Sequence, residues 1–156
     1  MSAVCNIGDE IVNRQELKEL LYSDSTDKAK SFLEHCNDAQ ELYVFAFNYN
    51  WDDGFEIPNI IMNNPACGLS TALQLFWSAD GLSYLVDKSE DPDLPKWSKF
   101  ISELYENILA GHYQADGIAF AAPITAVQRF KLRKSLDAQE YVFIENIAGI
   151  DLDIPL

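Results

Sequence analysis

Apolar residues recur along most of the chain at the spacing of amphipathic α-helices. Leu17, Leu20 and Leu21 form the first stripe of this kind. Asn13 and Glu16 precede it with the spacing of a capping box, in which two side chains satisfy free N–H groups of a first turn. The sequence therefore predicts a helix that begins after Asn13.

The next stripe consists of Ala29, Phe32, Leu33 and Cys36, and it predicts a second helix. A run of Ser, Thr and Asp over residues 23–27 separates the two, because such side chains break one helix and cap the next.

The segment Ala39–Tyr49 differs because its central residues, 42–47, are apolar on every side. A helix that is apolar all round is a buried one, so this segment is predicted to be the central helix. A fully buried strand is the competing interpretation of such a run.

Four further helices are predicted from Pro, Gly and apolar spacing. They run from Pro58 to Met62, from Leu69 to a stop at Ala79-Asp80-Gly81, from Pro95 to Gly111, and from near Pro123 to about Leu136. Gly81 is expected to take a positive φ there. Residues 82–86 are ambiguous, and the tail after Tyr141 fits a strand or a loop.

These elements predict a mainly α protein of about six to seven helices, packed as helical pairs, with a possible short C-terminal strand. The 156 residues are expected to form one compact domain, residues 1–156.

The charge of the chain limits the classes of partner that it can bind. The chain has 25 acidic and 11 basic residues, a net charge of −14, and residues 31–87 contain no Lys or Arg. Binding to nucleic acid or to an anionic membrane surface needs clustered cations, so neither is expected as a direct partner. A basic protein partner is allowed, and solubility alone is the plain alternative.

Basic residues gather in the last predicted helix. Arg129, Lys131, Arg133 and Lys134 are four of the chain's eleven. Their simplest interpretation is an exposed helix face that pairs with some of the many carboxylates.

The chain is expected to work in the cytoplasm. No basic residue precedes Arg14 and no apolar signal region is present, so a secretory signal is not expected. No apolar run approaches the roughly 18 residues of a membrane span. Cys5, Cys36 and Cys67 cannot all pair within one chain and lack zinc-ligand spacing, so reduced thiols are expected.

The densest polar segment offers a first candidate binding site. Asp52, Asp53 and Glu56 could form a carboxylate cluster for a basic partner or for a hard metal ion. The spacing of a calcium-binding EF-hand loop is absent, so the metal interpretation is the weaker of the two.

The same segment also has a structural interpretation. Trp51 and Phe55 would anchor it in the core, Gly54 would take a left-handed bend, and Pro58 would open the next helix.

A second acidic cluster is the predicted loop with Asp87, Glu90, Asp91 and Asp93, which precedes Trp97. Carboxylates around an exposed aromatic residue would suit an interface against Arg and Lys. The alternative is a solvated loop with Trp97 in the core, where its helical stripe places it.

Catalysis is not expected. The sequence lacks a phosphate-binding Gly-rich loop, a G-x-S-x-G elbow and an H-E-x-x-H motif. Its two histidines, His35 and His112, have no motif around them, and neighbours such as His35 and Cys36 point about 100° apart on a helix. No cofactor and no metal are implied.

The stretch Leu42–Gly81, about a quarter of the chain, resembles a family of small bacterial domains of unknown function. The resemblance rests on Asn50-Trp51-Asp52-x-Gly54-Phe55-x-x-Pro58, Asn64-Pro65-x-Cys67, Ala72-Leu73-x-Leu75-Phe76 and Ala79-Asp80-Gly81. Several members resemble immunity proteins of bacterial toxin systems. The resemblance implies a non-enzymatic protein that binds and neutralises a cognate toxin.

Together these observations predict an immunity protein, present as a monomer or weak homodimer, that occludes the basic cleft of a cognate toxin, most simply a nuclease. The contacts are expected at one or both acidic clusters. A helical adaptor with an exposed apolar groove is the first alternative. A metal-dependent enzyme built on Asp52, Asp53 and Glu56 is the second.

Overall fold

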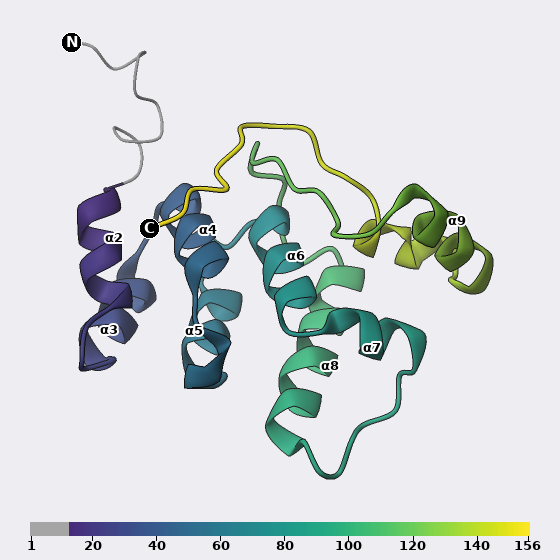
Figure 1. Ribbon diagram of the computed structural model, residues 1–156, viewed down its shortest axis with the longest axis horizontal. Helices are drawn as coiled ribbons and strands as arrows, with labels where there is room; N and C mark the ends of the chain where they lie inside the picture. Colours follow the sequence, from purple (N-terminus) through teal and green to yellow (C-terminus); the bar gives the residue numbers. More distant parts are fainter. Residues whose placement is uncertain (1–12) are drawn as a thin grey trace.

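A computed structural model describes residues 13–156 of the protein, and they are mainly helical (Figure 1). The α-helices are α2 (Arg14–Leu21), α3 (Asp27–His35), α4 (Ala39–Asn48), α5 (Glu56–Asn63), α6 (Leu69–Ser78), α7 (Gly81–Val86), α8 (Pro95–Leu109) and α9 (Ala126–Ser135). Two 3₁₀ helices, η2 (Trp51–Asp53) and η3 (Ala138–Phe143), complete the set. The mainly α prediction is confirmed. Cys5 and the segment searched for a secretory signal lie outside the described residues, apart from Asn13 and Arg14.

The helices pack in two rows. α2, α4 and α6 lie side by side, with α4 in the middle (Figure 1). In the second row α3 packs against α5, while α8 packs against α6 and α7. The predicted helix-on-helix packing is therefore confirmed.

The centre of this arrangement is α4, as its all-round apolar sequence predicts. Leu42, Tyr43, Val44, Phe45 and Ala46 are all buried. The side chain of the preceding Asp38 accepts hydrogen bonds from the backbone N–H groups of the first turn. The competing interpretation of this segment as a buried strand is wrong.

A local hydrogen bond also caps α2. The Asn13 side chain accepts a hydrogen bond from the backbone N–H of Glu16 at 3.1 Å, which confirms the predicted cap of α2.

The turn between α6 and α7 differs from the prediction. Asp80, not Gly81, takes the left-handed conformation, with φ of 60°. Gly81 instead begins α7, the segment whose sequence was ambiguous. A Cβ atom at Gly81 would lie 2.3 Å from Cδ2 of Phe76, so the glycine permits close packing of the two helices.

The possible C-terminal strand is not found in residues 13–156. Tyr141 lies in η3, and only isolated β-bridges join Ile118 to Ile150 and Phe120 to Ile147. The backbone after η3 forms only these two separate bridges with residues 118–120, which are too few for a β-ladder.

The last residues run back across the molecule to α4 (Figure 1). The Tyr43 hydroxyl donates a hydrogen bond to Asp153 at 2.6 Å, and the amide of Asn48 donates to the Ile154 carbonyl at 2.8 Å. The two ends of the described chain are thus packed against the same helix. None of the helices in residues 13–156 has the length and apolar character to cross a membrane.

Candidate partner-binding site

The acidic loop between α7 and α8 has a defined conformation. The buried Ser98 hydroxyl accepts a hydrogen bond from the backbone N–H of Asp91 at 2.9 Å. The Asp91 carboxylate in turn accepts from the N–H of Asp93, also at 2.9 Å, and Asp87 accepts from Ser89. The bond between Asp91 and Ser98 attaches the loop to the first turn of α8, and the other bonds order the loop itself.

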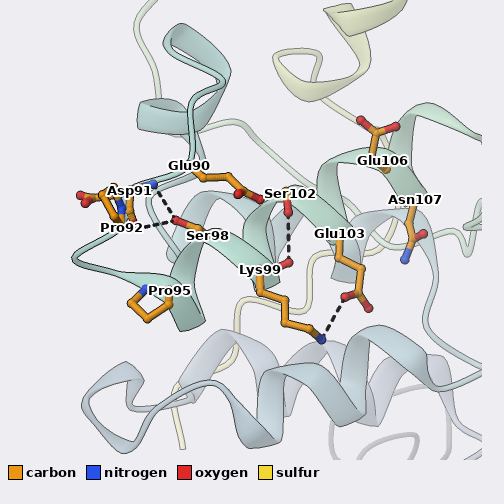
Figure 2. A pocket seen from close by; sticks show the side chains of 10 residues that line it. All are labelled: Glu90, Asp91, Pro92, Pro95, Ser98, Lys99, Ser102, Glu103, Glu106 and Asn107. Carbon is orange, nitrogen blue, oxygen red and sulfur yellow. Dashed lines mark hydrogen bonds and ion pairs between the residues drawn. The ribbon is translucent and has the colours of Figure 1, made fainter.

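The loop and α8 enclose an open depression of about 770 Å³ (Figure 2). Its walls combine carboxylates, the rings of two prolines and a few small polar groups. They are formed by Glu90, Asp91, Pro92, Pro95, Ser98, Lys99, Ser102, Glu103, Glu106 and Asn107.

The depression is predominantly acidic. Four carboxylates line it, those of Glu90, Asp91, Glu103 and Glu106, against the single ammonium group of Lys99. Glu90 extends from the loop toward α8, and Glu103 faces Lys99 from the next turn at 3.6 Å (Figure 2). Because the four carboxylates outnumber the one ammonium group, the surface keeps a net negative charge.

The structure brings together only part of the acidic cluster predicted from the loop. Glu90 and Asp91 line the depression, whereas Asp87 and Asp93 do not. Glu103 and Glu106 line it but were missing from the prediction. Their one-turn spacing on the face of α8 opposite its apolar stripe was the available signal, and most helices carry such a polar face.

Trp97 provides no exposed aromatic centre for this loop. It packs against the core, where its indole N–H donates a hydrogen bond to the Ala79 carbonyl at 2.6 Å. Its ring lies edge-on to that of Tyr84. The apolar part of the depression is therefore supplied by Pro92 and Pro95.

The other predicted carboxylates lie around the start of α5. Asp52 and Asp53 are exposed in η2, which begins where the Asn50 side chain accepts from the N–H of Asp52. Glu56, in the first turn of α5, forms an ion pair with Lys30 of α3. Glu56 is thus already partly neutralised by a neighbouring helix.

The backbone between them turns at Gly54, which has φ of 94°. Trp51 and Phe55 flank this turn and both pack on Phe100 of α8, with ring centroids 5.9 and 5.3 Å away. Pro58 is buried in the first turn of α5. The aromatic residues of the motif therefore attach it to α8.

The two acidic clusters flank the same end of α8. A second depression, of about 340 Å³, is lined by Asp53, Glu56 and the face of α8 that carries Lys96 and Lys99. Lys99 borders both depressions. Because two lysines face the smaller depression, the larger one is the more acidic of the two.

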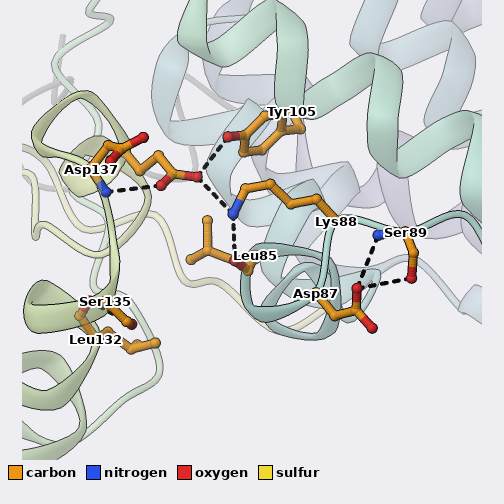
Figure 3. A network of polar contacts seen from close by, with 9 residues as sticks. Leu85, Asp87, Lys88, Ser89, Tyr105, Leu132, Ser135 and Asp137 are labelled. Atoms are coloured by element: carbon orange, nitrogen blue, oxygen red, sulfur yellow. Dashed lines mark hydrogen bonds and ion pairs between the residues drawn. The ribbon is translucent and has the colours of Figure 1, made fainter.

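The buried carboxylate of Glu140 connects the acidic loop to the C-terminal segment, and its partners Tyr105, Lys88 and Asp137 are labelled in Figure 3. Glu140 accepts hydrogen bonds from the Tyr105 hydroxyl at 2.6 Å and from its neighbour Asp137 at 3.0 Å, and it pairs with Lys88 at 2.9 Å. Lys88 also donates to the Leu85 carbonyl at 2.7 Å. Lys88 lies two residues after the end of α7, so this network holds the start of the loop.

The network sets the charge state of Glu140. Burial alone would raise the pKa of this carboxyl, but the hydrogen bonds from Tyr105 and Lys88 outweigh it and hold the pKa below its ordinary value. In the loop itself, hydrogen bonds from Ser89 lower the pKa of Asp87. Both carboxylates are ionised at neutral pH.

Residues 37–109 match the family described as "Domain of unknown function (DUF4274)". The matched segment supports the resemblance to an uncharacterised small-domain family. It runs from just before α4 to the end of α8, so it includes both acidic clusters and all of the larger depression. α9 and η3 follow the match. No curated protein and no solved structure matches the chain.

The described residues do not form a metal centre. Among residues 13–156, no three His, Cys, Asp or Glu side chains are grouped closely enough to hold a metal ion. Asp52, Asp53 and Glu56 are not grouped in that way.

The two described cysteines, Cys36 and Cys67, are not paired. Burial raises the pKa of Cys67 to about 12. A thiol with so high a pKa is almost entirely protonated at neutral pH and is a poor nucleophile.

Proposed function

We propose that the protein binds a basic partner protein through the depression lined by the acidic loop and α8. The observation that carries this proposal is the convergence of Glu90, Asp91, Glu103 and Glu106 on one depression. The finer proposal, taken from the family resemblance, is an immunity protein that neutralises a cognate toxin, most simply a nuclease.

Electrostatic complementarity supports a basic partner. A nuclease cleft that holds a phosphate backbone is lined by cations. An acidic surface on a chain of net charge −14 attracts such a cleft and repels nucleic acid. Pro92 and Pro95 supply apolar area beside the carboxylates, as the centre of a stable interface requires.

The fixed loop also favours binding. Ordering a mobile loop on association costs about 0.5–1.5 kcal/mol for each flexible side chain that is immobilised. The hydrogen bonds of Asp91 to Ser98 and Asp93 order the loop backbone before a partner arrives. More of the contact energy is then available as affinity.

A growth assay tests the finer proposal. The open reading frame next to this gene is expressed in a naive host with and without the chain. If the neighbour kills and the chain rescues growth, the chain is an immunity protein. A neighbour that is harmless, or that kills regardless, contradicts that role.

Two charge variants then locate the surface. E90K/E103K/E106K should lose rescue, because it reverses three of the four carboxylates. E19K/D24K/E34K changes the charge by the same amount at exposed sites on or near α2 and α3, so it should still rescue. Equal rescue by both variants would place the interface elsewhere.

The two alternatives predict other outcomes. A helical adaptor would leave toxicity unchanged and bind through apolar contacts. A metal-dependent enzyme would release or absorb heat when titrated with millimolar Mg²⁺ or Ca²⁺, whereas the proposed binding protein should give no heat.

A further inference from the structure

α9 differs from the other described α-helices in how little of it is buried. All ten of its residues are described, and none of them is buried. Isolated helices shorter than about 12–15 residues are marginal in water. α9 is maintained by a capping box, in which Thr125 and Gln128 bond to each other's backbone, and by attachments along one face.

The attached face points toward the C-terminal segment. Arg129 donates to the Ile144 carbonyl at 2.8 Å and to the Asn146 side chain at 3.1 Å. Arg133 pairs with Glu145. Leu132 packs against the core from the same side of the helix. Two of the four cations of α9, Arg129 and Arg133, therefore bind the chain's own C-terminal segment.

The opposite face carries a stripe of exposed side chains, Val127, Phe130, Lys131 and Lys134. Val127 is 62% exposed and Phe130 is 61% exposed. Their spacing places all four on one side of the helix, one turn apart. The Lys134 ammonium lies 4.4 Å from the centroid of the Phe130 ring. A helix enters a partner's groove with an apolar stripe of this kind.

The distribution of charge indicates which kind of surface the α9 stripe can bind. Residues 117–136 contain no Asp or Glu, whereas the whole chain carries −14. Two copies of so acidic a protein repel each other unless a basic surface of one meets an acidic surface of the other. α9 lies at one end of the molecule, away from α2 and α3 (Figure 1).

We propose that the α9 stripe docks in the acidic depression of a second copy of this chain. Lys131 and Lys134 would face the carboxylates of Glu103 and Glu106 and their neighbours. Val127 and Phe130 would cover Pro92 and Pro95. A face-to-face contact of two α9 helices is disfavoured, because it would bring lysines against lysines.

A single helix face buries less than the roughly 1,200 Å² of a stable interface, so the association is weak. This inference goes beyond the proposed function. It rests on the acidity of the depression and would hold for a depression that binds no toxin.

Sedimentation velocity of the full chain tests it, over about a hundredfold concentration range that reaches the sub-millimolar values a weak contact requires. The mean mass should rise with concentration for the wild type. F130A and K131E/K134E should stay monomeric over that range. K18E/K28E, with the same change of charge on α2 and α3, should associate like the wild type.

A mixture of two charge variants gives a second test of the same contact. E103K/E106K should also stay monomeric, because its depression repels α9. Mixing it with K131E/K134E should restore association, since the unchanged α9 of E103K/E106K then meets the unchanged depression of K131E/K134E. Circular dichroism checks that each variant is folded. A wild type that is monomeric throughout, association that survives K131E/K134E, or a mixture that stays monomeric would overturn the proposal. No toxin is present, so this result is independent of the growth assay.

Discussion

Two helices of ten residues each, α4 and α9, show how differently one chain can use the same element. α4 buries five consecutive residues and packs between its neighbours. α9 buries none and holds its place by capping and by polar contacts of its arginines. The stability of α4 therefore comes from packing, while α9 leaves one whole side exposed.

The largest effect on stability is expected when an aromatic ring is removed from α4. Phe45→Ala should lower the free energy of unfolding by about 3–5 kcal/mol, because it opens a cavity in a packed core. Phe45 is 1% exposed. Urea denaturation followed by circular dichroism measures the change. A loss below 1 kcal/mol would show that α4 is not the packing centre.

The next effect is expected in η3, which follows α9 and packs on α8. Glu140→Gln should cost about 1–3 kcal/mol, since Lys88 and Tyr105 lose a charged hydrogen-bond partner. Glu145→Gln is the matched control, because the exposed pair of Glu145 with Arg133 should contribute at most about 1 kcal/mol. Equal losses in the two variants would contradict the role given to Glu140.

The stability difference between the wild type and Glu140→Gln should also depend on pH. The folded pKa of Glu140 is lowered from its ordinary value of 4.5. Its contribution is therefore complete above that pH and is lost as the pH falls through the folded pKa. The difference in stability between wild type and Glu140→Gln should shrink below pH 4.5, and a difference that grows there would contradict the sign.

A smaller and local effect is expected at the start of α9. Thr125→Ala removes the capping box and should destabilise the helix by about 1 kcal/mol. Hydrogen exchange of the α9 amides should become faster, with exchange in α4 unchanged. Faster exchange in both helices would mean that α9 and the core unfold together.

The smallest effect is expected from Phe130→Ala. A substitution at an exposed site away from packing usually changes stability by no more than about 0.5 kcal/mol. Phe130→Ala should therefore unfold at nearly the same urea concentration as the wild type, in contrast to Phe45→Ala. A large loss would show that Phe130 packs within its own chain.

Elements set by local signals could be predicted from the sequence. The Asn13 cap, the apolar run of α4 and the stripe of α8 each act within one or two turns of the chain. The C-terminal tail could not, because its conformation depends on distant partners such as Tyr43 and Asn48. The ambiguous residues 82–86 became α7 because they pack on α6 and α8.

The candidate site was predicted only in part, for a similar reason. A loop rich in Asp and Glu is visible in the sequence, so Glu90 and Asp91 were found. Glu103 and Glu106 occupy the polar face of a helix, where carboxylates are common, and only the folded loop beside them makes them part of a depression. Glu140 is 35 residues from Tyr105, and no local pattern indicates that pairing.

The dissociation rate of the proposed complex, formed with a toxin that the chain neutralises in the growth assay, tests the central claim most directly. The wild type, E90K/E103K/E106K and E19K/D24K/E34K would be compared by surface plasmon resonance. The account predicts much faster dissociation for the first variant, by about tenfold for each 1.4 kcal/mol of lost contact energy, and a nearly unchanged rate for the second. Equal dissociation rates for all three proteins would contradict the claim that the depression at α8 is the binding surface.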